Sequence, residues 1–226
     1  IGQEGEETDV ASTAIELVSE EPTRTLYLAS LFRFSAGLTI GAWCAPYFKS
    51  AFPEDIGAFS AVNAGIVSLA GLASAAAGGE AVERMGQRAD VDARMVVAAA
   101  SSVMAAVAWA ATVKAGGFEA AVALLALEYL VGEAWFGPAV GYLQASARDG
   151  GVAQGLFSVT AGLANVAPGL LGAVVGSELL PGGGELGLAD GLAWAVGGCY
   201  VASAALFWRA GTLPKGRKDA ENLKKS

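Results

Sequence analysis

The stretch FEAAVALLALEYLVGEAWFGPAVGYL, Phe118–Leu143, is apolar over a length that can cross a lipid bilayer. A hydrocarbon core of about 30 Å requires about 20 helical residues at a rise of 1.5 Å each. Backbone polar groups in lipid must pair within their own segment, so such a stretch is expected to be a helix. Five further stretches have the same character: Thr25–Tyr47, Ile56–Gly78, Met95–Val113, Gly151–Gly176 and Leu188–Phe207. The predicted fold class is an all-α membrane protein with six transmembrane helices.

The overall composition agrees with this prediction. Hydrophobic residues make up 54% of the chain and charged residues 16%, with a mean hydropathy of +0.49, which differs from an ordinary soluble domain. Most of the 31 glycines lie inside the apolar stretches, where small residues let helix backbones approach one another. The lipid bilayer is therefore an expected partner. With a net charge of −8, the composition does not indicate nucleic-acid binding.

The basic residues predict the orientation of the chain in the membrane. An even number of spans places both termini on one side, and basic residues mark the cytoplasmic face. Eleven of the 14 basic residues fall on the side of the termini: Arg24, Arg84, Arg88, Arg94, Arg148, Arg209, Lys215, Arg217, Lys218, Lys224 and Lys225. We therefore predict a multi-pass integral membrane protein with both termini in the cytoplasm.

The predicted spans and the charged ends divide the chain into three parts. Residues 1–24 are predicted to form an acidic cytoplasmic linker, residues 25–210 the six-helix transmembrane domain, and residues 211–226 a basic cytoplasmic tail. The first residues contain no basic and apolar signal peptide and no initiator Met, so we expect the chain to continue upstream of Ile1.

Several classes of enzyme lack their motifs in this chain. The sequence has no histidine, which excludes a Ser–His dyad and a histidine metal site, and it has neither a Gly-x-Gly-Asp stretch nor a Walker loop. Cys44 and Cys199 both lie within spans and are interpreted as small packing residues. No enzymatic activity, cofactor or metal is predicted.

Three charged residues lie deep within the predicted spans. A charge at the centre of a span costs at least about 2.5–3.5 kcal/mol, so it normally faces a cavity or a partner. At 1.5 Å per residue, Arg33 lies roughly 12 Å deep and Glu133 about 15 Å deep, while Glu128 lies near the midplane. Arg33 and Glu133 are thus expected to pair across a cavity. Arg33 would bind an anionic group of a solute, or release Glu133 for proton transfer; the alternative is a structural ion pair that locks two helices.

Three other residues are candidates for the same pathway. Trp43 and Trp135 lie on the helices that carry the charges, and Asn165 is a single polar residue in the fifth span. Each also has an alternative role: packing or lipid contact for the tryptophans, and an interhelical hydrogen bond for Asn165. The first and fourth spans both carry an ionisable residue and a proline, which suggests two three-helix repeats of the kind that build many secondary transporters.

The segment GEAVERMGQR, residues 79–88, has the form Gly-x-x-x-acid-Arg-x-Gly-x-Arg and lies between the second and third spans. It resembles the loop signature of the major facilitator superfamily, with Glu in the position where the family usually has Asp. The resemblance implies a cytoplasmic gating loop whose acid pairs with Arg or a helix N-terminus. The alternative is an ordinary turn with topogenic arginines. The motif residues are Gly79, Glu83, Arg84, Gly86 and Arg88.

Three further segments extend the resemblance: residues 41–48, 132–144 and 165–169 look like the C-terminal half of Spinster-type members of this superfamily. The resemblance covers residues 24–210. The chain departs from the family in two ways. Members often carry an Arg near the position of Gly150, whereas this chain has Arg148 instead, and the family's N-terminal six helices are absent. The resemblance implies half of a twelve-helix fold, made of two inverted three-helix repeats.

The implied function is secondary active transport of a small organic solute by alternating access, driven by a coupling ion. Anionic and amphiphilic solutes are both compatible with the residues. The pathway would need a missing N-terminal half or a second copy of the chain, because the substrate site lies between two six-helix halves. The alternative is a six-helix membrane scaffold or assembly subunit that transports nothing.

Overall fold

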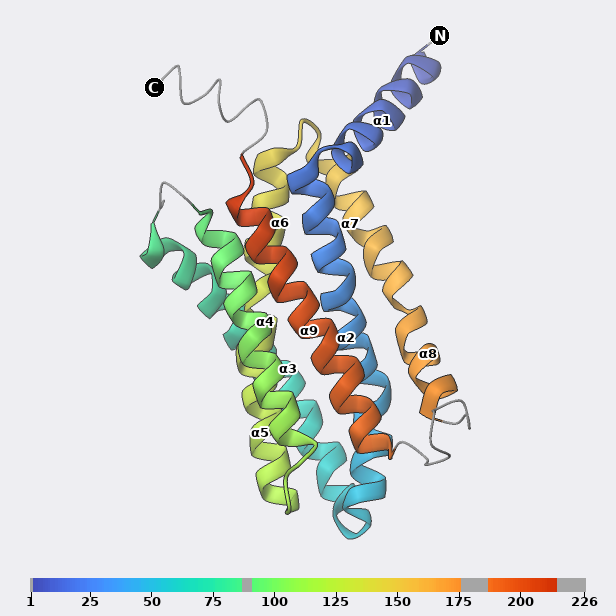
Figure 1. Ribbon diagram of the computed structural model, residues 1–226, viewed down its shortest axis with the longest axis vertical. Helices are drawn as coiled ribbons and strands as arrows, with labels where there is room; N and C mark the ends of the chain where they lie inside the picture. The colour runs from blue at the N-terminus through green and yellow to red at the C-terminus, as the bar shows by residue number, and fades with distance from the viewer. Residues whose placement is uncertain (1, 87–90, 176–186, 215–226) are drawn as a thin grey trace.

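Six apolar helical spans lie side by side along the long axis of the computed structural model, which describes residues 2–86, 91–175 and 187–214 (Figure 1). All regular structure in these residues is helical. The spans comprise α2 (Glu21–Ala51), η1 and α3 (Pro53–Asp55, Ile56–Met85), α4 (Ala93–Thr112), α5, η2 and α6 (Phe118–Gly132, Glu133–Trp135, Phe136–Ser146), α7 and α8 (Gly150–Ala164, Val166–Val175) and α9 (Leu188–Thr212). Each is long and apolar enough to cross a membrane, so this is a multi-pass membrane protein.

Two of the spans are broken a few residues before a proline. Pro138 has no N–H to bond the carbonyl of Ala134, and its ring crowds that carbonyl, so the helix tightens into the 3₁₀ turn η2. Pro168 stands in the same relation to Ala164, and there α7 ends and α8 begins. The sequence predicts uninterrupted helices in both places, and the structure differs because each proline removes one hydrogen bond from the ladder.

The acidic N-terminal segment also differs from the expected linker. Residues Gly2–Ser19 form helix α1, which ends where Glu20 adopts an extended backbone just before Pro22. The final turns of α1 dock on the bundle, because Leu17 is only 3% exposed and the Thr23 hydroxyl donates a hydrogen bond to the Leu17 carbonyl. The apolar residues that follow the acidic run account for this packing.

The helices pack in a pattern that repeats between the first three spans and the last three. Span one, α2, packs mainly against α9 and also against α7 and α8. Span four, formed by α5, η2 and α6, packs against α4 and also against α3. The third and sixth spans, α4 and α9, contact each other extensively. If spans one, two and three are exchanged with spans four, five and six, each of these contacts between spans corresponds to another contact in the same set.

The interior contains two apolar clusters stacked along the bundle. One, near the end where α2 begins and α9 ends, includes Leu26, Met95 and Phe207. The other, nearer the opposite end, includes Ile40, Phe48 and Trp109. An ion pair of 2.6 Å between Glu21 and Arg209 confirms that the first and last spans meet at the same end.

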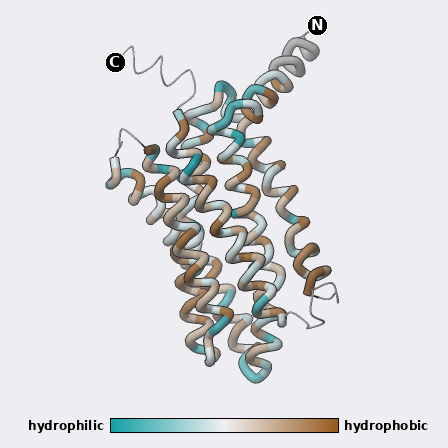
Figure 2. Tube along the Cα trace, viewed as in Figure 1, coloured by the Kyte–Doolittle hydropathy of each residue, from teal (hydrophilic) through white to brown (hydrophobic). Residues whose placement is uncertain are grey.

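The outer surface of the spans is apolar, as contact with lipid requires. Figure 2 shows hydrophobic residues along the spans, with hydrophilic residues mainly near the helix ends. Leu69 and Leu72 of α3 are each 73% exposed, and Trp194 of α9 is 77% exposed. Only 6% of the apolar window of α3 is buried, which makes this helix the most exposed of the six spans.

Candidate functional site

Arg33 of α2 is buried in the middle of the bundle, with its side chain 1% exposed. Its Nη2 atom donates a 2.7 Å hydrogen bond to the carbonyl of Gly132 and lies 3.4 Å from Oε1 of Glu133. The guanidinium carbon lies 4.6 Å from the ring centre of Tyr200, a cation–π distance. The buried charge is therefore compensated by a carboxylate, a carbonyl and an aromatic face.

The carbonyl that Arg33 contacts lies at the break in span four. The 3₁₀ turn η2 after α5 has poorer hydrogen-bond geometry than an α-helix, and the negative end of the α5 dipole favours a cation there. The Ser101 hydroxyl of α4 lies 2.8 Å from both the Val131 and the Gly132 carbonyl oxygens. Arg33 and Ser101 together satisfy the end of α5, so the proline-induced break also positions the arginine.

Glu128 is the second carboxylate of the site and is more deeply buried than Glu133. It is 2% exposed and accepts a hydrogen bond from the hydroxyl of Tyr200 on α9. The side chain of Glu133 is 39% exposed. One guanidinium thus faces two carboxylates, one sealed within the bundle and one partly open.

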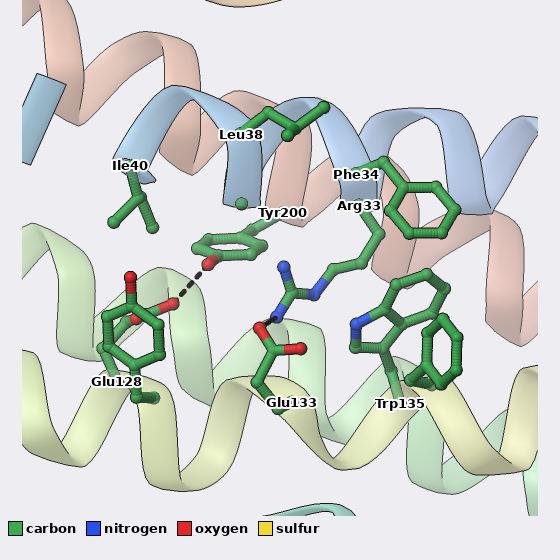
Figure 3. A pocket seen from close by; sticks show the side chains of 11 residues that line it. Arg33, Phe34, Leu38, Ile40, Glu128, Glu133, Trp135 and Tyr200 are labelled. Atoms are coloured by element: carbon green, nitrogen blue, oxygen red, sulfur yellow. Dashed lines mark hydrogen bonds and ion pairs between the residues drawn. The ribbon is translucent and has the colours of Figure 1, made fainter. Parts of the chain in front are cut away.

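These side chains surround a cavity of about 270 Å³ between α2, α9 and the broken span four (Figure 3). The cavity lies where the two apolar clusters meet, since Trp135 belongs to one and Tyr200 to the other. Aromatic and apolar side chains form much of the wall. The lining residues are Arg33, Phe34, Gly37, Leu38, Ile40, Glu128, Tyr129, Glu133, Trp135, Phe136 and Tyr200. The arrangement can hold a small polar solute or bind and release a proton.

The predicted contact between Arg33 and Glu133 is confirmed, and Glu128 and Trp135 line the same cavity. The other two pathway candidates lie elsewhere. The indole Nε1 of half-buried Trp43 donates a 2.9 Å hydrogen bond to the carbonyl of Pro168, which joins α2 to α8. The amide of exposed Asn165 donates to the Ala161 carbonyl in its own span. A pathway role for these two residues stays a prediction.

The motif predicted to gate the cytoplasmic side lies at the end of α3. Gly79, Glu83 and Arg84 are exposed helical residues, and Arg84 pairs with Glu80 one turn earlier at 2.7 Å. Gly86 ends the helix with a φ of 61°, a left-handed backbone that favours glycine. Arg88 lies outside the described residues. The gating role of this segment stays a prediction.

Sequence reasoning missed Tyr200, Ser101 and Gly132 as parts of the site. Tyr200 is a lone phenol in the middle of a span otherwise made of small and apolar residues, and that contrast could have indicated a buried polar partner. Ser101 had no comparable signal, because serine is common in transmembrane helices. Gly132 takes part through its backbone carbonyl, which no side-chain motif reveals.

Comparison with models of known protein families, with curated proteins and with solved structures finds no match.

Proposed function

We propose that this chain is a six-helix half of a secondary transporter of the major facilitator type, resembling the Spinster branch. It would move a small organic solute by alternating access, coupled to an ion gradient. The observation that carries this proposal is the ion pair between buried Arg33 and half-open Glu133 beside the 270 Å³ cavity. Ionisable groups within spans are costly, and they are characteristic of substrate and ion pathways.

The repeated packing pattern supports the two-repeat part of the proposal. Spans one and four occupy equivalent places in the two groups of three. Successive spans alternate in direction, so spans one and four run in opposite directions (Figure 1). In inverted-repeat transporters, units arranged in this way are related by a twofold axis in the plane of the membrane. The cavity lies between these two equivalent spans, where transporters of this design bind their solute.

The number of charges in the cavity supports ion coupling. Two carboxylates share one guanidinium, so their full ionisation leaves one negative charge uncompensated among Arg33, Glu128 and Glu133. A coupling proton or another cation would neutralise it. Movement of the helices would then change which carboxylate Arg33 contacts, and so link solute binding to ion binding.

The decisive experiment exchanges Glu133 for Gln in the full-length protein and measures pH-driven uptake of a panel of organic solutes into proteoliposomes. Loss of gradient-driven uptake is expected, because Gln keeps the shape of the side chain but cannot carry a proton or a charge. Glu119→Gln is the matched control, since Glu119 is an exposed acid at the start of the same span and does not line the cavity. Unchanged uptake by Glu133→Gln would contradict the proposal and favour a structural ion pair.

A second candidate, a membrane scaffold that assembles with partners, is favoured by the exposure of α3. Several of its glycines have open space where a Cβ atom would stand: Gly57, Gly65, Gly71 and Gly79. Exposed glycines on a transmembrane helix allow close packing against another helix. The missing half of a transporter, a second copy of the chain or a scaffold partner could each use this surface. Uptake by the full-length protein discriminates the transporter from the scaffold.

A further inference from the structure

Two buried N–H donors at the cavity wall lack a hydrogen-bond acceptor. They are Nε of Arg33 and Nε1 of Trp135, and neither has a partner in the part of the chain that the structure describes. The two side chains are 1% and 2% exposed. Buried N–H groups in proteins are rarely left without an acceptor. Two such donors on one cavity wall therefore point to a bound group that accepts from them.

The two donors lie on neighbouring parts of one surface. The guanidinium carbon of Arg33 lies 5.5 Å from the ring centre of Trp135, and both side chains line the cavity. Figure 3 shows the indole nitrogen turned toward the Arg33 side chain. The Nη2 atom of Arg33 is already engaged by Gly132 and Glu133, whereas Nε remains available. Such a pair of donors suits the two oxygens of a carboxylate.

The charges nearby limit which carboxylate-bearing molecule can enter. Glu128 and Glu133 already face the single guanidinium, so a guest with only a negative charge would add to the repulsion. A guest that also carries an ammonium group would add no net charge. Glu133, with its side chain 39% exposed, can accept hydrogen bonds from that ammonium group. The aromatic walls at Phe34 and Phe136 suit an apolar body.

We infer that the cavity binds a small zwitterion, with its carboxylate on Arg33 Nε and Trp135 Nε1, its ammonium on Glu133, and its apolar body on the aromatic wall. The cavity of 270 Å³ compares with about 30 Å³ per molecule of liquid water, which leaves space for one compact organic molecule. That such a molecule is also the transported solute rests on the proposed function.

The test measures equilibrium binding of radiolabelled L-phenylalanine and L-leucine to the purified full-length protein. 3-Phenylpropanoate, which lacks the ammonium, and 2-phenylethylamine, which lacks the carboxylate, serve as competitors. Each charge-assisted hydrogen bond lost should weaken binding by about tenfold or more, so both competitors should bind more weakly than phenylalanine.

Two variants separate the two ends of the ligand. Trp135→Phe removes the indole donor and should weaken phenylalanine and 3-phenylpropanoate by about tenfold while leaving 2-phenylethylamine unchanged. Glu133→Gln should weaken phenylalanine and 2-phenylethylamine but not 3-phenylpropanoate. Trp194→Phe is the control, because Trp194 is 77% exposed and away from the cavity, and it should change none of the three.

Three outcomes would overturn the inference. They are no saturable binding of either amino acid, equal binding of phenylalanine and its singly charged analogues, and equal effects of Trp135→Phe on all three ligands. Glu133→Gln keeps the test decisive if Trp135→Phe does not fold, since Glu133 is partly exposed.

The binding test and the uptake test can fail separately. Gradient-driven uptake of another solute that is lost in Glu133→Gln, together with no amino-acid binding, would leave the transporter and remove the zwitterion site. Amino-acid binding with the expected pattern but no uptake of any solute would leave the site and remove transport.

Discussion

Gly78 of α3 packs directly against the carbonyl of Ala134 in the broken span four. A Cβ atom built on Gly78 would stand 2.3 Å from the Ala134 oxygen, far inside van der Waals contact. The carbonyl of Ala134 is the one that Pro138 cannot bond, because proline has no N–H. The glycine therefore allows α3 to approach the freed carbonyl at the place where the chain turns toward Arg33.

We expect Gly78→Ala to destabilise the bundle. The clash is with backbone, so α3 must shift, at a cost of about 1–3 kcal/mol for overpacking. Thermal unfolding in detergent should show a Tm lower by several degrees, since about 1 kcal/mol corresponds to roughly 2–4 °C for a chain of this size. Gly71→Ala is the control, because nothing lies within 4 Å of the added methyl group in the same helix. Equal Tm values for the two variants would contradict this packing.

A second prediction concerns the hydrogen bond between Tyr200 and Glu128. Tyr200→Phe keeps the ring that faces Arg33 but removes the hydroxyl that donates to the buried carboxylate. We expect a loss of about 1.5–3 kcal/mol, the usual range for a hydrogen bond to a charged group. This loss can be measured as the difference in the free energy of unfolding between the two proteins, in a denaturant that mixes with the detergent.

A double-mutant cycle tests whether that loss belongs to the pair. After Glu128→Gln, the further change Tyr200→Phe should cost less than it does alone, because the charged acceptor is already absent. Additive losses from the two single variants would mean that the residues do not interact in the folded protein.

The third prediction is that Glu133 lies in contact with water. Cysteine reacts as the thiolate, which forms in water and not in lipid. In a variant with Cys44 and Cys199 replaced by Ala, Glu133→Cys should react with a charged, membrane-impermeant thiol reagent, whereas Leu72→Cys should not. Leu72 is 73% exposed on the apolar face of α3 and is expected to face lipid. Labelling of both positions, or of Leu72→Cys alone, would remove the aqueous pathway from the proposal.

The fourth prediction is the orientation of the chain. Fluorescent proteins fused to the two ends of the chain should both be digested when a protease enters the cytoplasm through a selectively permeabilised plasma membrane, and neither should be digested when the protease stays outside intact cells. The reason is the accumulation of arginines at one end of the bundle, which favours retention in the cytoplasm. Protection of either end from a protease in the cytoplasm would contradict the six-span topology or its predicted direction.

Much of the architecture follows from the sequence, because the bilayer imposes simple rules on length and polarity. Six apolar stretches predict six helices, and the structure has them, with most ends extended by a few residues. The pairing of Arg33 with Glu133 was also predictable, since a constant rise per residue places both at similar depth in the membrane. The helical form of residues 2–19 and the docking of the final turns of this helix were not predicted, and the docking depends on contacts of Leu17 with distant parts of the chain.

The sequence by itself determined the number of spans, their apolar surfaces and the depth of each charge, since these depend on local composition along one axis. Only the tertiary structure decided which residues meet across that axis. It brings Tyr200 to Glu128, the Gly132 carbonyl to Arg33 and the indole of Trp135 to the same cavity. The rotation of each helix and the break before Pro138 produce these contacts, and the rotation depends on how neighbouring helices pack.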